Sequence, residues 1–382
     1  MRILYGVVGE GMGHATRSRV VIDHLLRQGH RVQVVVSGPA HGFLRDSLAG
    51  RLGLSLEEIA GLRLVHDGAG IDKSRSFWSN LASAPKGLAR NLGAWDEVAR
   101  SFRADAVISD FESWAYTWAI THGVPVLSLD NMQVIDRCAH PPEVAPSDPV
   151  DRLVAKWAVK AKLPGADHYL VSSFFFPPVR KRFTTLLPPI LRPEVLAARP
   201  EPGEHLLVYQ HPGALRATLP ALKALEVEVR AYGLGEDLVD GNVRHRPFSG
   251  EGFVEDLRTA RAVVAGGGYS LMGEAVHLRV PMLAVPLDGQ YEQELNARWL
   301  AHLGYGRHAD RLTPAALGGF LDGLPSHRAA LQRYQPRDNA MLFGAVDEVL
   351  ARLASGERRL LYLHSASLGD WPGSRTEAAL GG

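Results

Sequence analysis

The sequence Val263-Val-Ala-Gly-Gly-Gly-Tyr-Ser-Leu-Met-Gly-Glu274-Ala275 decides the fold class of this 382-residue chain. Its apolar start predicts a buried strand, and its three glycines predict a turn whose backbone amides can approach an anion such as phosphate. A helix is expected to begin near Ser270, where free N–H groups and the positive end of the helix dipole face the same anion. Glu274 lies about one turn inside this helix. Its carboxylate can accept hydrogen bonds from two neighbouring hydroxyls, as a ribose presents them.

Two segments that follow extend the same unit. Val280-Pro-Met-Leu-Ala-Val-Pro286 predicts a second strand that ends at Pro286. Gln290-Tyr-Glu-Gln-Glu-Leu-Asn296 then predicts a second helix, with Glu292, Gln293 and Asn296 in its opening turns, where acceptor and amide groups can bind sugar hydroxyls. A lone strand, glycine turn and helix with an exposed carboxylate would fit any α/β protein. Three linked elements in this order favour a nucleotide-sugar pocket.

The combined pattern, Gly-Gly-x-x-x-x-x-Glu-Ala, Val-Pro-x-x-x-x-Pro and Glu-Gln-x-x-Asn, resembles the donor-site signature of GT-B glycosyltransferases. It is most similar to the bacterial and archaeal branch related to the muramyl-pathway N-acetylglucosaminyltransferase and the UDP-glucuronosyltransferases. Gly266 and Leu271 stand where many members have His, Ser or Thr contacts to phosphate, so more of that task falls to backbone amides. The resemblance implies that the diphosphate is bound by Gly267, Gly268 and Ser270. It also implies that Glu274 binds the ribose and that the sugar is bound by Glu292, Gln293 and Asn296.

The composition excludes several classes of protein. Hydrophobic residues make up 46% and charged residues 22% of the chain, as in soluble globular proteins. The formal net charge of +1 lacks the basic excess that nucleic-acid binding uses, so no nucleic-acid partner is expected. Cys138 is the single cysteine, which excludes an intramolecular disulfide and fits a reducing cytoplasm. Because no signal peptide, membrane-spanning run, Asp-x-Asp or His-Glu-x-x-His motif is evident, we expect a cytoplasmic protein without a metal or other cofactor.

Short apolar segments alternate with helical patterns along the chain, which is typical of parallel sheets covered by helices. This alternation predicts an α/β fold with two doubly wound domains, and the resemblance implies GT-B architecture, in which two such Rossmann-like domains with parallel sheets face an interdomain cleft. Residues 1–195 would form the acceptor-binding domain, 203–355 the donor-binding domain, and 356–382 a loosely ordered tail. The expected strands are Ile3–Val8, Arg31–Val36, Ala106–Ser109, Val124–Leu129, His168–Ser172, His205–Tyr209, Val227–Ala231 and Ala262–Ala265.

A second glycine-rich loop, Gly9-Glu-Gly11-Met-Gly13-His14-Ala-Thr-Arg17, follows the first expected strand. Gly11 and Gly13 allow a substrate or its phosphate to approach the backbone at the start of a helix. A dinucleotide fingerprint would have Gly in place of His14 and an acidic residue where the chain has Ser37 and Gly38, so a nicotinamide enzyme is not favoured. In the GT-B enzymes that this chain resembles, a His at the position of His14 takes the proton of the acceptor hydroxyl, as imidazole can near neutral pH.

A carboxylate is expected beside His14. Ala104-Asp-Ala-Val-Ile-Ser-Asp110 predicts a strand that ends in Asp110, and the strand ends of a parallel sheet gather at the ligand edge. Because plant members of the family use a similarly placed Asp to orient the His, the resemblance implies a His14–Asp110 pair. Glu112 is a rival for Asp110. The structural alternatives are a helix-capping role for His14 and a loop cap for Asp110.

The resemblance implies an inverting, metal-independent glycosyltransferase that moves a hexosyl group from a UDP- or dTDP-sugar to a hydroxyl acceptor. The acceptor oxygen would displace the nucleoside diphosphate directly, with His14 as the base. Two other functions stay open. An epimerase of GT-B-like fold would change the nucleotide-sugar without an acceptor, and a non-catalytic nucleotide-sugar binder would turn nothing over.

The nucleobase and acceptor sites are less distinct in the sequence. Arg246-Pro-Phe248 and Phe253 precede the glycines where related enzymes hold the base, and we expect Phe248 at the base and Phe253 in ordinary packing. The acceptor, a small molecule or a lipid-linked hydroxyl compound, is expected in the amino-terminal domain. Residues 66–72 and 73–78 are candidates for that site or a solvated loop.

One expected helix carries a row of cations. Its basic side chains recur every four residues on one face, close to an aromatic residue: Arg152, Lys156, Lys160 and Trp157. A plain solvated face is the simpler interpretation. A peripheral contact with an anionic membrane surface or a lipid-linked acceptor is the alternative.

Overall fold

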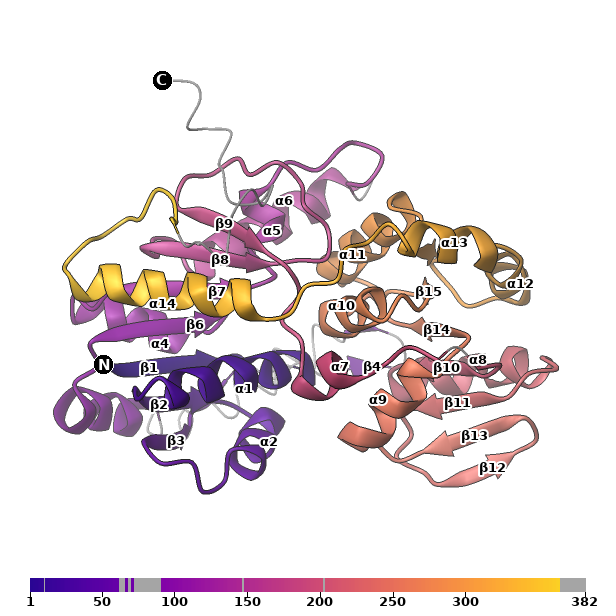
Figure 1. The fold of residues 1–382 in the computed structure, drawn as a ribbon, viewed down its shortest axis with the longest axis horizontal. Helices are drawn as coiled ribbons and strands as arrows, with labels where there is room; N and C mark the ends of the chain where they lie inside the picture. Colours follow the sequence, from indigo (N-terminus) through magenta and orange to yellow (C-terminus); the bar gives the residue numbers. More distant parts are fainter. Residues whose placement is uncertain are drawn as a thin grey trace.

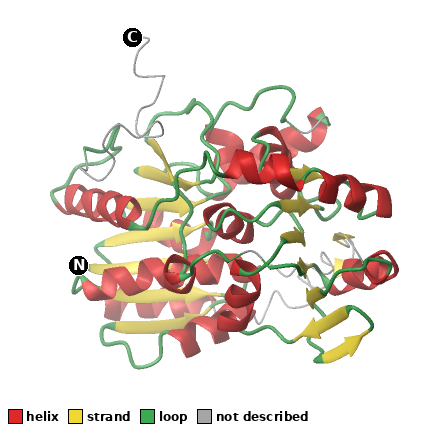
Figure 2. Ribbon diagram, turned by 45° about the vertical axis from the view of Figure 1, so that its right-hand side comes forward, coloured by secondary structure: helices red, strands yellow, loops and turns green. Residues whose placement is uncertain are grey.

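The computed structural model of this chain describes residues 1–9, 11–61, 66–67, 70–71, 91–145, 148–201 and 203–364. They form two lobes that lie side by side, each built on a seven-stranded sheet (Figure 1). Helices cover both sheets (Figure 2). The predicted α/β fold with two mainly parallel sheets is therefore confirmed.

The first lobe is built on a sheet in which every pair of neighbouring strands is parallel. Its strand order is β3-β2-β1-β6-β7-β8-β9. In chain order the strands are β1 Arg2–Val7, β2 Arg31–Val36, β3 Leu54–Glu58, β6 Ala106–Asp110, β7 Val126–Asp130, β8 His168–Ser172 and β9 Thr184–Leu187.

The helices of this part of the chain include one turn of π-helix, η1. They are α1 Met12–Arg27, α2 Pro39–Ser47, η1 Val98–Phe102, α4 Ser113–Thr121, α5 Val134–Arg137, α6 Pro149–Lys162 and α7 Pro193–Ala197. A separate antiparallel pair is formed by β4 His66–Asp67 and β5 Gly70–Ile71.

The second lobe is built on a sheet with the order β12-β13-β11-β10-β14-β15-β16, in which only the β12–β13 pair is antiparallel. Its strands are β10 Leu206–Tyr209, β11 Val229–Tyr232, β12 Leu238–Asp240, β13 Val243–Arg246, β14 Ala262–Ala265, β15 Met282–Ala284 and β16 Gly306–His308. The helices in this part of the chain are α8 Pro212–Lys223, α9 Gly250–Arg258, α10 Tyr269–His277, α11 Tyr291–His302, α12 Pro314–Asp322, α13 Leu324–Leu331 and α14 Ala340–Ala354.

Most of the inner strands are the ones that the sequence predicts, and β13 is the exception. β2, β8 and β14 have the expected bounds, because strands buried on both faces are continuous apolar runs. The edge strands β3, β9, β12 and β16 were not expected. β12 is mostly exposed and β3 is only partly buried, so the sequences of these two strands carry polar residues and no such run.

The chain returns to the first lobe at its end. Helix α14, within the range 203–355 that the sequence assigns to the second domain, buries one face in the same cluster as β1 and β2 (Figure 1). His24 of α1 contacts Asp347 of α14 at 2.8 Å. Residues 356–364 of the expected tail also pack there, since Leu360 and Leu363 are buried in that cluster. Residues 365–382 lie outside the described part of the chain.

The two lobes are in direct contact. One apolar cluster runs through both, and Phe175 of the first lobe stacks on Trp299 of α11 with ring centroids 4.8 Å apart. The indole N–H of Trp299 donates to Nδ1 of His140 at 3.1 Å, and the hydroxyls of Ser172 and Tyr269 are hydrogen-bonded. The end of β8 therefore lies at the start of α10. Among the described helices, none is long and apolar enough to cross a membrane.

Candidate active site

Glycines shape the loop that follows β1. A Cβ atom on Gly9 would lie 2.0 Å from the carbonyl oxygen of Ser37, so no side chain fits there. Gly11 precedes α1 with a φ of 83°, in the left-handed region that favours glycine. On Gly13 a Cβ would lie 2.8 Å from Oγ of Ser270 in the second lobe. The start of α1, with His14 in its first turn, is thereby held against the second lobe.

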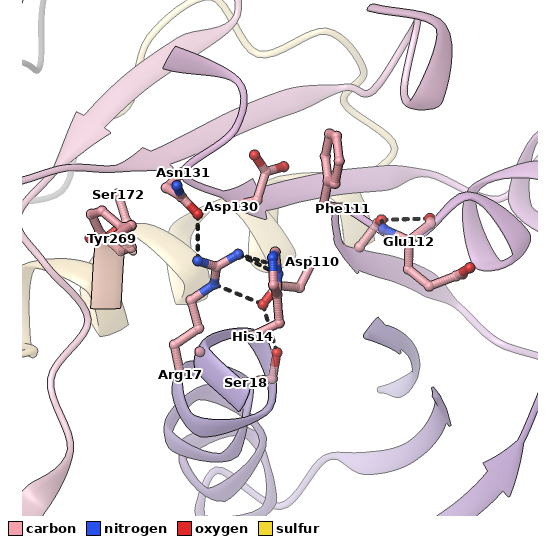
Figure 3. Close-up of polar contacts among 12 residues, drawn as sticks. His14, Arg17, Ser18, Asp110, Phe111, Glu112, Asp130, Asn131, Ser172 and Tyr269 are labelled. Atoms are coloured by element: carbon pink, nitrogen blue, oxygen red, sulfur yellow. Dashed lines mark hydrogen bonds and ion pairs between the residues drawn. The ribbon is translucent and has the colours of Figure 1, made fainter. Parts of the chain in front are cut away.

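The structure places His14 next to Asp110. Nδ1 of His14 lies 2.8 Å from Oδ1 of Asp110 at the carboxyl end of β6 (Figure 3). Val7 of β1 is paired in register with Asp110, so the glycine loop and the carboxylate meet at one edge of the sheet. His14 does not cap α1, because no side chain hydrogen-bonds the first amides of that helix.

The rival carboxylate, Glu112, has a different role. It is the N-cap of α4, where its oxygens accept hydrogen bonds from the amides of Trp114 at 2.9 Å and Ala115 at 2.7 Å. It lies on the far side of Asp110 from Arg17 in the close-up (Figure 3). A carboxylate whose two oxygens both accept hydrogen bonds from helix amides has a structural role as an N-cap.

Asp110 is fully buried, and its charge is held in place by hydrogen bonds. Oδ2 accepts from Nε of Arg17 and from Oγ of Ser18, each at 2.8 Å, and Oδ1 accepts from Nη2 of Arg17. Burial alone would raise the pKa of Asp110, but Arg17 and His14 hold it well below its usual range. Burial, and then the charge of Arg17, lower the pKa of His14 against the opposing effect of Asp110. The pair is a neutral imidazole beside an ionised carboxylate near neutral pH.

Sequence reasoning assigned no role to Arg17, Asp130 or Asn131. Nη1 of Arg17 donates to Oδ1 of Asn131 at 2.5 Å, and Asn131 follows the end of β7 (Figure 3). Burial, followed by the charge of Asp110, raises the pKa of Asp130 to about 6. Two features could have indicated these residues. Arg17 lies one helical turn after His14 in the sequence. Strand β7, which pairs with β6, ends one residue later than the predicted strand.

The glycine turn of the second lobe meets α11. A Cβ on Gly267 would lie 2.1 Å from the carbonyl oxygen of Gln293, so this glycine is required by the close approach of the α11 backbone. Gly268 is the N-cap of α10, and a Cβ there would have no atom within 4 Å. The hydroxyl of Ser270 donates to the carbonyl oxygen of Gly13 at 3.3 Å. The start of α10, the expected diphosphate position, therefore faces the loop that carries His14.

Glu274 is buried and paired. Its two carboxylate oxygens accept hydrogen bonds from Nε and Nη2 of Arg192, both at 2.7 Å. The pair links α10 to the segment that connects the lobes, and it shows that Glu274 is not an exposed helical residue. Each carboxylate oxygen has a second lone pair, so the pairing leaves acceptor capacity for a ribose hydroxyl.

The expected sugar-reading residues lie at the start of α11. Oε1 of Glu292 accepts from Nδ2 of Asn131 at 2.8 Å and from Nδ2 of Asn296 at 2.6 Å. Asn296 is buried and also donates to the carbonyl oxygen of Gly267 at 3.1 Å. Oε1 of Gln293 accepts from the amide of Leu287 at 3.1 Å. Glu292 is thus held between the lobes.

Aromatic side chains gather where β10, β11 and β13 end. Phe248 is 55% exposed and lies 5.4 Å, centroid to centroid, from the ring of Phe253. Phe253 is buried in the apolar cluster, in agreement with a packing role. Arg246 donates to Asp256 at 2.9 Å. Phe248 offers an open ring face on which a planar base could stack.

The segments 66–72 and 73–78, considered for the acceptor, lie almost entirely outside the described residues. The cationic helix is α6, and one of its sides faces solvent. Within the described residues no three His, Cys, Asp or Glu side chains are grouped as a metal site requires.

Comparison with known proteins identifies the family. The family model of Glycosyl transferase family 1 matches residues 1–325. An uncharacterized glycosyltransferase of Methanosarcina acetivorans is 25% identical over 350 residues, which cover 82% of this chain and 87% of the relative. The UDP-N-acetylglucosamine–N-acetylmuramyl-(pentapeptide) pyrophosphoryl-undecaprenol N-acetylglucosamine transferase of Staphylococcus epidermidis is 32% identical over 107 residues, 25% of this chain and 30% of that protein.

Solved structures share the fold. The calicheamicin glycosyltransferase CalG4 superposes with a TM-score of 0.62 at 18% identity, over 92% of this chain and 98% of that chain. A UDP-glucosyltransferase from Polygonum tinctorium gives a TM-score of 0.65 at 15% identity, over 93% and 98%. The chain belongs to glycosyl transferase family 1, and it is a glycosyltransferase of GT-B fold.

Proposed function

We propose that this glycosyltransferase moves a hexosyl group from a UDP- or dTDP-sugar to a hydroxyl acceptor, with inversion and without a metal ion. The observation that carries the proposal is the contact between the two motifs. The hydroxyl of Ser270, in the first turn of α10, reaches the backbone of Gly13, the residue before His14. A donor bound at α10 would therefore present its sugar close to a histidine that is paired with a carboxylate.

The proposed reaction is a single displacement. The acceptor oxygen forms a bond to the anomeric carbon while the bond from that carbon to the diphosphate oxygen breaks on the opposite face. Nε2 of His14 takes the proton of the acceptor hydroxyl, and Asp110 stabilises the resulting imidazolium through Nδ1. The negative charge that develops on the leaving diphosphate would be stabilised by the free amides at the start of α10.

The first test is calorimetric titration of UDP and dTDP in EDTA. We expect metal-free binding of one of them by the wild type and weaker binding by Glu274→Ala. Because Glu274 is paired with Arg192, the matched control is Arg192→Ala, which breaks the pair but keeps the carboxylate. Equal losses in both variants would trace the effect to the pair rather than to ribose. No binding by the folded wild type would contradict the proposal.

The stereochemistry of the product is a second test. A single displacement inverts the anomeric centre, so the product anomer must be opposite to that of the donor. NMR of the anomeric proton in the product decides between the outcomes. Retention of configuration would rule out the single displacement with His14 as base, even if the donor site is correct.

We also propose that α6 contacts an anionic membrane surface, where a lipid-linked acceptor would be held. Its exposed apolar side chains, each between 58% and 65% accessible, recur at the spacing of one helical face and are Val150, Leu153, Val154 and Trp157. Basic side chains lie beside this stripe. The pKa of Lys156 is lowered by burial and by the neighbouring positive charges of Arg180 and Arg152, which shows that cations are concentrated here. A cationic helix with an open apolar face suits an interface with anionic lipid.

The end of α6 lies close to the catalytic pair. Nζ of Lys162 donates to the carbonyl oxygen of Phe111, the residue after Asp110, at 3.1 Å. The test is sedimentation with vesicles of phosphatidylglycerol or phosphatidylcholine. Binding to the anionic vesicles should be lost in Trp157→Ser and in Lys156→Glu, and kept in Leu52→Ser, which alters an exposed leucine elsewhere. Absence of vesicle binding by the wild type, or self-association through this face, would contradict the membrane contact.

A further inference from the structure

Arg17 is the most heavily engaged side chain at the catalytic pair. It lies on α1 one turn after His14 and is only 3% accessible. Its guanidinium forms a bidentate pair with Asp110, in which Nε donates to Oδ2 and Nη2 donates to Oδ1. The third nitrogen, Nη1, donates to Asn131. Nη2 also lies 2.6 Å from Nδ1 of His14. A buried bidentate arginine fixes the orientation of a carboxylate more firmly than a monodentate contact can.

These contacts decide which nitrogen of His14 can act as a base. A neutral imidazole carries one proton, and the nitrogen that carries it donates. Guanidinium nitrogens only donate, so a hydrogen bond from Arg17 to Nδ1 would place the imidazole proton on Nε2 and disable Nε2 as a base. A hydrogen bond from Nδ1 to Oδ1 of Asp110 places the proton on Nδ1 and leaves Nε2 free. The two contacts compete for Nδ1, and we assign its proton to the bond with Oδ1, because Asp110 is an ionised carboxylate that Arg17 holds within reach of Nδ1 and a hydrogen bond to a charged acceptor is the stronger one.

We propose that Arg17 is a positioning residue, which holds Asp110 so that the proton of His14 stays on Nδ1, and which connects this pair through Asn131 to Glu292 of the donor side. The inference rests on the proposed role of His14 as the base. Arg17 does not touch the reacting atoms. Its effect passes through Asp110 on one side and through Asn131 on the other.

The positive charge of Arg17 also affects the pKa of His14. The charged groups that act on His14 are Asp110 of β6, which favours the imidazolium, and Arg17 of α1 and Lys162 of α6, which oppose it. Asp130 of β7 acts on Arg17. With Arg17 present the imidazole remains neutral to lower pH, so a larger fraction of the enzyme carries an active base.

The link to the donor side crosses between the lobes. Nη1 of Arg17 donates to Asn131, Nδ2 of Asn131 donates to Oε1 of Glu292, and Asn296 donates to that oxygen and to the backbone of Gly267. Oε2 of Glu292 takes part in none of these contacts. A donor sugar can therefore bind Oε2 while Oε1 keeps the connection to the catalytic pair.

The first experiment compares the pH profiles of kcat/KM for the wild type, Arg17→Met and Arg17→Lys. In Arg17→Met the acid limb should move to higher pH by about 1 unit or more, because a neighbouring positive charge is lost. In Arg17→Lys the charge remains, so the limb should stay near that of the wild type while kcat falls, since lysine cannot grip both oxygens of Asp110. The matched control is Arg19→Met, an arginine of the same helix that pairs with Glu194.

A limb that does not move in Arg17→Met would overturn the inference and leave Arg17 a structural residue. NMR of the nitrogen-labelled histidine gives a readout that needs neither substrate nor turnover. We expect the proton of His14 on Nδ1 in the wild type, and a raised midpoint of its titration in Arg17→Met. A proton on Nε2 in the wild type would contradict the proposed arrangement. Failure of nucleotide binding, in contrast, would contradict the proposed function and leave the NMR result intact.

The link between the lobes has its own test. Asn131→Ala, Glu292→Ala and the double variant are titrated with UDP and with a UDP-sugar. Because the two side chains share one hydrogen bond, their effects on the affinity for the sugar should not multiply. Losses that multiply would show that the two residues act independently and would remove the link.

Discussion

Asp110 illustrates how much of this site is decided by single buried side chains. Its carboxylate is surrounded by Arg17, Ser18 and His14, and it is ionised although it is buried. The proton acceptor of the proposed reaction is therefore a neutral imidazole, whose pKa is lowered first by burial and then by Arg17.

A pH dependence follows for the wild type. Transfer requires neutral His14, so activity is present above its pKa and is lost as pH falls through it. Because this pKa is lowered, the acid limb of kcat/KM should lie below the ordinary histidine value of about 6.5. The rate is measured at constant ionic strength. A limb above that value would contradict a neutral, buried base.

Removal of the base gives a residue-scale prediction for activity. In His14→Ala, kcat should fall by roughly 10²–10⁴-fold, the usual contribution of general base catalysis. Binding of UDP should remain, because the proposed donor contacts come from α10 and α11. Steady-state kinetics and calorimetry on the same preparation check both statements. An unchanged kcat would remove His14 as the base.

The Arg192–Glu274 pair leads to a prediction for stability. Both side chains are nearly inaccessible, so Arg192→Ala leaves a buried carboxylate without its partner. The free energy of unfolding should fall by about 3–5 kcal/mol, as for other broken buried pairs. Urea denaturation measures it. The control is Arg2→Ala, which breaks the exposed Arg2–Asp105 pair and should change the free energy of unfolding little. An equally small loss for Arg192→Ala would show that the buried pair contributes no more to stability than an exposed one.

At the scale of elements, the approach of α11 to the glycine turn is the most constrained contact. Gly267→Ala would place a methyl group 2.1 Å from the carbonyl oxygen of Gln293, so α11 must shift and the protein should lose at least about 1–3 kcal/mol of stability. Gly268→Ala adds the same methyl group where no atom lies within 4 Å, and it is the matched control. Thermal unfolding compares the two. Equal stability of both variants would contradict the packing of α11 on this turn.

At the scale of the whole molecule, α14 joins the end of the chain to its beginning. Val349 is fully buried in the cluster of the first sheet, whereas Ala351, two residues later, is exposed. Val349→Asp buries a charge without a partner and should destabilise the first lobe, while Ala351→Asp should be tolerated. Hydrogen exchange should show protection lost in β1 and β2. Loss confined to β10 and β14 would mean that α14 supports the second lobe instead.

The sequence by itself determined the fold class and most central strands, because a strand buried on both faces must be a continuous apolar run. Alternation of such runs with helices is enough to indicate parallel sheets. It also indicated the expected donor elements around Gly268 and Glu292, since their residues lie close together along the chain. His14 and Asp110 could be suggested because the family resemblance points to such a pair and the ends of parallel strands meet at one edge.

Only the tertiary structure decided which distant residues meet. Arg17 and Asp110 are 93 residues apart, Arg192 and Glu274 are 82 apart, and Asn131 reaches Glu292 across the two lobes. The return of α14 to the first sheet is of the same kind. An apolar helix face has many surfaces on which it could pack, and a buried charge has many potential partners. The choice among them depends on how the complete lobes fit together, which no local pattern of residues records.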